Sequence, residues 1–132
     1  MRVPQVQALL ICERIIRDHG SHRLSLINIF ADIGTEEFPA TFPEVWVYCR
    51  MINAVGRYNF TLRIVKVGVQ EEKVMDIERS FDCPNPAIMV EASFQIAKVM
   101  FREPALYEFR MIVEGETIGQ TTLRITRLPR SS

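Results

Sequence analysis

Apolar and polar residues alternate with a period of two along most of this chain, and this period predicts β-strands. The clearest strand follows Gly56, where four apolar residues face one way and three polar residues face the other. The apolar row is Tyr58, Phe60, Leu62 and Ile64, and the polar row is Asn59, Thr61 and Arg63. Such a strand has one face on a core and one face in water.

A second clear pattern lies in the last quarter of the chain. Charged residues alternate there with an apolar row that consists of Tyr107, Phe109, Met111 and Val113. The run Glu114-Gly115-Glu116 follows, and a glycine at this place is typical of a tight turn between antiparallel strands. We therefore predict a closing β-hairpin that ends near Ile125.

Eight extended segments can be marked in this way, bounded by glycine, proline and asparagine. They cover residues 6–16, 24–33, 45–52, 58–64, 73–81 and 88–101, followed by the two strands of the closing hairpin. The first segment is apolar on both sides near its middle, which suits a central strand. A short helix over residues 5–17 is the alternative for that segment.

Eight short strands about 12 residues apart predict an all-β fold in which no helix is required. We expect a single antiparallel β-sandwich of the immunoglobulin-like type over residues 1–126, followed by a short flexible tail over residues 127–132. Phe38-Pro39 and Phe42-Pro43 frame a loop before the third strand. Two aromatic and proline pairs favour a loop that is held against the core.

The balance of charge limits the classes of partner. The 132 residues include 16 basic and 16 acidic ones, which gives a formal net charge of zero. This balance argues against nonspecific binding to nucleic acid or to an anionic membrane. No segment has the roughly 20 apolar residues that cross a bilayer, and the first residues lack a signal-peptide core. We therefore expect a cytoplasmic protein.

The three cysteines are an odd number without the paired spacing of a zinc site, which favours reduced thiols inside the cell. Cys12 and Cys49 lie among apolar residues and are interpreted as small core residues. Cys83 lies in the run Asp82-Cys-Pro-Asn-Pro86, which predicts a surface loop and makes it the most reactive-looking thiol. The neighbouring Asp82 is expected to raise the pKa of Cys83.

Four stretches of the chain resemble a known family. They are Leu10-Ile-Cys-Glu13, Ser25-Leu-Ile-Asn-Ile-Phe30, Phe38-Pro39, and the run from Phe101 to Tyr107 before a hydrophobic hairpin. In these stretches the chain is similar to a family of uncharacterised bacterial proteins known only as a domain of unknown function. The resemblance covers nearly the whole chain and implies an all-β sandwich. It implies no activity that can be carried over.

Three arginines form the first candidate binding site. Arg63, Arg110 and Arg124 face outward on the last clear strands, and guanidinium groups on one face suit carboxylates, phosphates or another small anionic ligand. The other interpretation is an ordinary solvated sheet face, neutralised by Glu108 and Glu91.

Two loop regions are further candidates. Phe38 and Phe42 either dock a partner protein or fold back on the chain's own core. The turn from Asp18 to His22 contains the only two histidines, and a His-x-x-His pair with a carboxylate can hold a divalent metal ion. Because a third or fourth ligand and helical spacing are missing, we expect no metal there, and no cofactor.

The sequence contains no recognisable catalytic set, so we assign no catalytic residue. We predict a non-catalytic, intracellular binding or assembly module with a protein partner or a second copy of itself. Unpaired backbone groups at open sheet edges provide the mechanism, because they are templates for another strand. The alternatives are a small-ligand or anion-binding sandwich that uses the three arginines, and a metal-dependent enzyme that uses the turn from Asp18 to His22.

Overall fold

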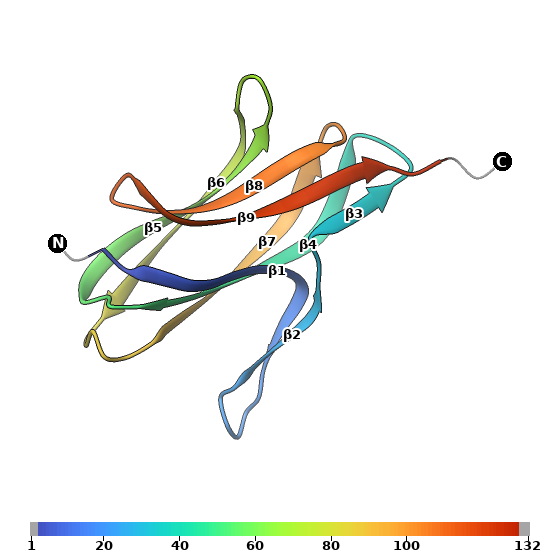
Figure 1. Cartoon of the computed structure of the whole chain (residues 1–132). Coiled ribbons are helices and arrows are strands. Elements are labelled where there is room, and N and C mark those ends of the chain that lie inside the picture. Colours follow the sequence, from blue (N-terminus) through green and yellow to red (C-terminus); the bar gives the residue numbers. More distant parts are fainter. Residues whose placement is uncertain (1–2, 130–132) are drawn as a thin grey trace.

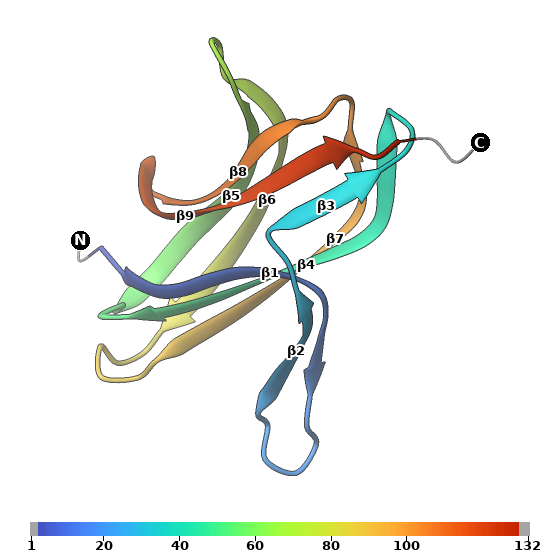
Figure 2. The same ribbon diagram turned by 45° about the vertical axis from the view of Figure 1, so that its right-hand side comes forward.

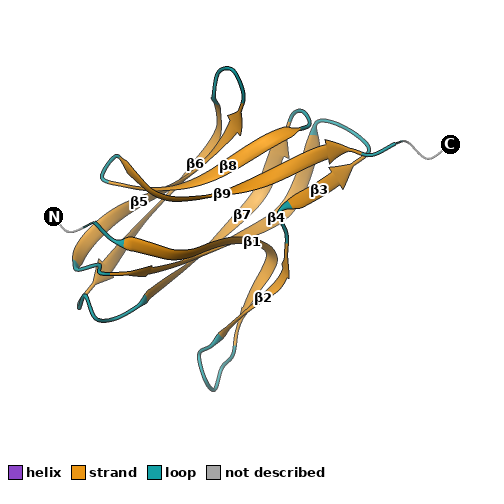
Figure 3. Cartoon of the chain, in the orientation of Figure 1, coloured by secondary structure: helices purple, strands orange, loops and turns teal. Residues whose placement is uncertain are grey.

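The computed structural model describes residues 3–129, and within this range the chain forms nine β-strands and no helix (Figures 1 and 3). The strands are β1 (Gln5–Arg17), β2 (Leu24–Ile29), β3 (Asp32–Thr35), β4 (Ala40–Ile52), β5 (Gly56–Val67), β6 (Glu72–Cys83), β7 (Val90–Phe101), β8 (Ala105–Val113) and β9 (Glu116–Arg127). The prediction of an all-β fold is confirmed. The alternative of a helix over residues 5–17 is wrong, because β1 occupies them. None of the described segments is a helix long and apolar enough to span a membrane.

The strands form two sheets. The first has four strands in the order β2-β1-β4-β7, and the second has five in the order β3-β9-β8-β5-β6. Neighbouring strands are antiparallel except β3 and β9, which are parallel. The prediction of a purely antiparallel arrangement is therefore wrong at one edge of the second sheet.

The segment predicted as one strand over residues 24–33 is two strands in different sheets. The Phe30 N–H donates to the Ile11 carbonyl at 3.0 Å in the first sheet, whereas the Arg124 N–H donates to the Ala31 carbonyl at 2.8 Å in the second. The chain thus crosses between the sheets at Phe30 and Ala31. This crossing raises the number of strands in the described range from the predicted eight to nine.

The inward-facing rows of the two sheets meet in one apolar core. Both apolar rows predicted from the sequence, on β5 and on β8, are buried there, which confirms their orientation. Aromatic rings join the layers: Phe81 lies 6.4 Å from Phe94 between ring centroids, and Phe101 lies 4.6 Å from Tyr107. Burial of these rings contributes a large share of the folding free energy, because aromatic side chains remove the most apolar area from water.

A local irregularity keeps β7 in phase with this core. Ala92, Phe94 and Ile96 are buried at even positions, but Val99 and Phe101 are buried at odd ones. The change occurs at Lys98, whose backbone is left-handed with φ of 59°. Lys98 stands opposite Pro43, since Phe42 pairs with Val99 and Glu44 with Ala97. Proline lacks an N–H, so the ladder is interrupted at this pair, while the register of the two strands is the same on both sides of it.

Several predicted boundaries need correction. β4 begins at Ala40, so Phe42-Pro43 belongs to the strand and not to the loop before it. β7 begins at Val90, and Ile88 is exposed outside it. β9 continues to Arg127, and the Leu128 N–H donates to the Thr35 carbonyl at 2.8 Å, so the predicted tail cannot start at residue 127. The last residues of that predicted tail, 130–132, lie outside the described residues.

The turn of the closing hairpin is confirmed at the predicted place. β8 ends at Val113 and β9 begins at Glu116, which leaves two residues between them. Glu114 has φ of 48° and Gly115 has φ of 82°. Two successive positive φ values define the turn type that matches the twist of antiparallel strands, and glycine adopts such values without steric cost.

We expect Phe60→Ala to lower the free energy of unfolding by about 3–5 kcal/mol, because the ring is fully buried and its loss leaves a cavity in the core. Chemical denaturation of the two proteins measures the difference. Val69→Ala at an exposed loop position is the control and should change the value by less than about 0.5 kcal/mol. A loss below about 1 kcal/mol for Phe60→Ala would contradict the central position of this ring.

Candidate functional site

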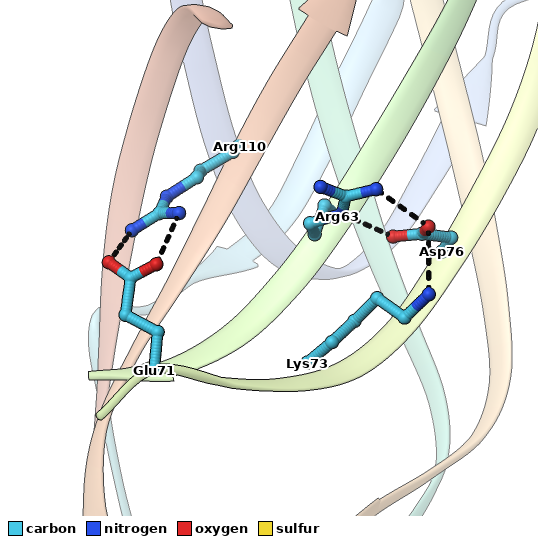
Figure 4. Close-up of polar contacts among 5 residues, drawn as sticks. All are labelled: Arg63, Glu71, Lys73, Asp76 and Arg110. Atoms are coloured by element: carbon cyan, nitrogen blue, oxygen red, sulfur yellow. Dashed lines mark hydrogen bonds and ion pairs between the residues drawn. The ribbon is translucent and has the colours of Figure 1, made fainter. Parts of the chain in front are cut away.

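Arg63 and Arg110 are direct partners across β5 and β8, so the sheet places their side chains beside each other on its outer face (Figure 4). Arg63 binds Asp76 of β6 with both ends of its fork: Nε lies 2.8 Å from Oδ1 and Nη2 lies 3.1 Å from Oδ2. Lys73 Nζ is 3.4 Å from the same Oδ2. Hydrogen bonds from Arg63 lower the pKa of Asp76 and raise that of Arg63.

Arg110 is also occupied. Its Nη1 donates to Glu71 Oε2 at 3.0 Å, its Nη2 donates to Glu71 Oε1, and its Nε donates to Glu108. The hydrogen bonds that Arg110 donates to Glu71 and, to a lesser extent, to Glu108 raise the pKa of Arg110. The expected role of Glu108 is confirmed, but Glu91 lies in the other sheet, where it accepts a hydrogen bond from Tyr48. Sequence reasoning missed Glu71 and Asp76, because only the strand order brings them to the arginines.

Arg124 does not join the other two arginines. It stands opposite Leu106 of β8 and Asp32 of β3, and its side chain is exposed. Within the described part of the chain it makes no ion pair. The three predicted arginines are therefore not one site, and two of them already bind carboxylates with their guanidinium forks. This geometry matches the interpretation as a neutralised, solvated sheet face.

The two phenylalanines fold back on the core, as the second interpretation of their loop predicts. Both side chains are half-buried and pack against core residues. Phe42 contacts Phe101 with 5.7 Å between ring centroids, and the guanidinium carbon of Arg127 lies 4.9 Å from the centre of the Phe38 ring. Both rings therefore contact residues of the chain itself.

The turn from Asp18 to His22 has a structural explanation. One carboxylate oxygen of Asp18 accepts hydrogen bonds from the Ser21 N–H at 2.7 Å and the Ser21 hydroxyl at 2.9 Å. These bonds lower the pKa of Asp18. Among residues 3–129 no group of three or more histidine, cysteine, aspartate or glutamate side chains is placed to hold a metal ion.

Cys83 is not in a surface loop as predicted. It is the last residue of β6 and is 2% exposed. Burial is the main cause of the raised pKa of Cys83, and the charge of Asp82 raises this pKa further. The predicted direction of the shift is therefore confirmed, although its main cause is burial and not Asp82. Cys12 and Cys49 are buried as expected, and burial raises the pKa of Cys49 to about 12. A thiol with a raised pKa is a poor nucleophile at neutral pH.

The edge strands of the two sheets differ in how they are protected against the addition of another strand. β2, β3, β6 and β7 are the four edge strands. β6 carries several charged residues, β7 carries Glu91 and Lys98, and β3 is only four residues long. Charges, bulges and short length are the usual means of preventing another strand from adding to an edge. β2, with the sequence Leu-Ser-Leu-Ile-Asn-Ile, has no charged residue among its six.

β2 pairs only with β1, and the end of the hairpin that they form projects beyond the rest of the two sheets (Figures 1 and 2). Apolar residues lie on both faces of this projecting hairpin. Ile16, Ile27 and Ile29 are 48%, 38% and 56% exposed on one face. Ile15, Leu24 and Leu26 are half-buried on the other face. The sequence contained a signal for this site, since residues 24–29 are apolar at both alternating sets of positions.

Comparison with known proteins gives a family but no activity. This all-β chain of two sheets matches the model of a family of unknown function, DUF6941, over residues 7–126. The chain therefore belongs to that family, which confirms the resemblance inferred from the sequence. No curated protein matches it.

Among solved structures, a β-glucosidase from Listeria innocua in complex with isofagomine is similar, with 8% sequence identity and a TM-score of 0.47. The match covers 96% of this chain and 16% of the glucosidase chain. The chain thus spans about a sixth of the length of that protein.

The ion pairs of the outer face predict how stability depends on pH. The folded pKa values of Asp76 and Glu71 lie below the ordinary values of 3.8 and 4.5 for these groups, because Arg63 and Arg110 donate hydrogen bonds to them. A carboxylate with a depressed pKa contributes stability that is present above the unfolded value and is lost as the pH falls through the folded one. We therefore expect the free energy of unfolding to decrease as the pH falls below 4.5.

Asp76→Asn tests this expectation. At pH 7 the variant should be less stable than the natural protein by about 1 kcal/mol, and at pH 3 the difference should shrink, because Asp76 of the natural protein is then being protonated. Urea denaturation at both pH values measures the gap. Asp82→Asn removes an exposed ion pair with Arg57 and is the matched control, with an effect below about 0.5 kcal/mol at pH 7. A gap that stays constant between the two pH values would rule out this role of Asp76.

Proposed function

We propose that this chain is an immunoglobulin-like β-sandwich that acts as a non-catalytic, cytoplasmic assembly module, and that it joins a second copy of itself through β2. One observation carries the proposal: among the edge strands of the described chain, β2 alone has no charged residue, while it lies in a hairpin with exposed isoleucines.

The strand order supports the immunoglobulin-like type. In that fold, one sheet contains strands G, F and C, with C′ added in variable-type domains, and the other contains A, B and E. The neighbours β9-β8-β5-β6 correspond to G-F-C-C′, and β1-β4-β7 correspond to A-B-E. Extra strands stand at one edge of each sheet: β2 beside β1, and β3 beside β9.

Tyr107 supports the same assignment. It is buried near the start of β8, the strand that corresponds to F, and its hydroxyl donates to the Glu103 carbonyl at 2.7 Å. A tyrosine near the start of strand F with a hydrogen bond to the backbone a few residues upstream is a hallmark of immunoglobulin-like sandwiches. The disulfide of antibody domains is replaced here by apolar packing, because Phe109 stands two residues after this tyrosine and Cys49 is a free thiol.

The side chains that looked suitable for chemistry are engaged in structural roles, which supports a non-catalytic protein. The forks of Arg63 and Arg110 bind carboxylates, and the Asp18 carboxylate is held by Ser21. All three cysteines are free and buried, and thiols without disulfides suit a reducing compartment such as the cytoplasm.

The projecting hairpin supports assembly because it lacks a core of its own. An isolated two-stranded hairpin is marginally stable in water and needs a third strand or another surface. A second copy supplies that strand when two β2 strands pair antiparallel across a two-fold axis. Identical strands meet without like-charge repulsion only where the strand is uncharged, as β2 is. Asn28 has φ of 52°, so residues 24–27 are the regular part of this edge.

Light scattering tests the proposal directly. We expect the natural protein to have a mass of about twice 15.3 kDa and the variant Ile27→Lys/Ile29→Lys to have the mass of the monomer. Lysines on β2 would bring like charges of the two copies into the same contact and leave charges beside its apolar residues, and dimerisation should weaken at least about tenfold. Circular dichroism should show an unchanged β-fold, because both isoleucines are exposed in the single chain.

Val55→Lys/Val69→Lys is the matched control, since it adds the same charge at two exposed positions away from β2 and should keep the dimer. A natural protein that stays at 15.3 kDa at the highest concentration reached would refute self-association. Equal dissociation of Ile27→Lys/Ile29→Lys and Val55→Lys/Val69→Lys would refute self-association through β2.

A further inference from the structure

A group of basic side chains lines a pocket that the proposed assembly does not use. The pocket has a volume of about 560 Å³ and is lined by residues of β5, β6, β7 and the turn that follows β7. Its charged lining residues are Lys66, Lys73, Lys98, Arg102, Glu72 and Glu103. The chain has only three lysines among its 16 basic residues, and all three are found here.

Protection of sheet edges explains only part of this cluster. Lys73 and Lys98 lie on the edge strands β6 and β7, where lysines discourage strand addition. Lys66 lies on β5, which has β8 on one side and β6 on the other, and its side chain is only 20% exposed. Arg102 follows β7 and is not in a strand. Neither Lys66 nor Arg102 protects a sheet edge. Edge protection therefore does not explain why these two cations line the same pocket.

The cations of the pocket differ in whether they are paired. Lys66 Nζ forms an ion pair with Glu103 and lies 3.5 Å from Glu72 Oε2, and these contacts hold it in place. The hydrogen bond from Tyr107 to the Glu103 carbonyl fixes the backbone of the same turn. Lys98 and Arg102 make no ion pair with any residue between 3 and 129.

The backbone of β7 is responsible for the position of Lys98. Its left-handed conformation switches the inward-facing positions from Ile96 to Val99, so both Ala97 and Lys98 are exposed on consecutive positions. Val99 is buried and forms part of the pocket lining beside the charged groups. Met75 and Met100 add apolar surface to the same lining. The pocket therefore combines unpaired cations with an apolar wall.

We propose that this basic pocket binds a phosphate group, either as the free anion or as part of an organic phosphate ester. The planar fork of Arg102 suits two phosphate oxygens, and Lys98 supplies a point charge beside it. The apolar wall of Val99, Met75 and Met100 suits the organic part of an ester.

Calorimetric titration of the natural protein with inorganic phosphate and with phenyl phosphate, at constant ionic strength, tests the proposal. We expect saturable binding with one site per chain, and tighter binding of phenyl phosphate if the natural ligand is an ester. Lys98→Ala/Arg102→Ala should weaken the affinity at least tenfold, because it removes both unpaired cations. Equal binding of the two probes would indicate the free anion as the ligand.

Arg57→Ala/Arg79→Ala is the control for net charge, since it removes two arginines of the neighbouring strands β5 and β6 that do not line the pocket. It should leave the affinity unchanged. Binding that is not saturable, or that weakens equally in both double variants, would overturn the proposal. Ile27→Lys/Ile29→Lys should keep phosphate binding, because β2 does not line the pocket, so failure of the assembly and failure of this site are separate results.

Discussion

The packing of one apolar row from each sheet against the other is the interaction on which the rest of this structure depends. A slip of one residue along a strand would turn its whole apolar row into water, so the phase of every strand relative to the core is tightly constrained. β7 meets this constraint with a left-handed residue, Lys98, opposite Pro43 of β4. The exposed position of this cation is thus a consequence of the need to bury Val99 and Phe101 after Ile96.

The same constraint determines the outer face of the second sheet. Once the apolar rows of β5 and β6 point inward, the alternate residues of each strand must point outward. The outward residues of β5 then stand opposite those of β6. Their cross-strand register joins complementary groups, namely Arg57 with Asp82, Asn59 with Ser80, and Arg63 with Asp76. Each pair contributes little by itself in water, but together with Glu71 these partners occupy the guanidinium forks of Arg63 and Arg110. These two arginines are therefore not open to an anion, whereas the unpaired Lys98 and Arg102 line the pocket between β6 and β7.

The fold could be predicted from the sequence wherever the period of two continued without a break, as on β5 and in the hairpin of β8 and β9. The prediction was wrong where the period changed: at Phe30 and Ala31, where the chain changes sheet, and at Lys98. Such changes leave no local signal, because each half of the segment has the pattern of an ordinary strand. The pairing of Arg110 with Glu71 could not be predicted either, since it depends on which strands are neighbours. The uncharged edge of β2 was visible in the sequence, but its importance required knowing that β2 is an edge strand.

The order of the first sheet separates the two proposed sites. β2 and β7 are its opposite edges, with β1 and β4 between them. Pairing of two β2 strands would join the first sheets of two copies into one continuous sheet, and each copy would present its β7 edge at an outer end. The pocket between β6 and β7 would therefore stay open in the dimer, and each copy would retain its own Lys98 and Arg102. Because the lysine-bearing edges would point away from the contact, the charges that we propose to bind an anion would also direct association toward β2.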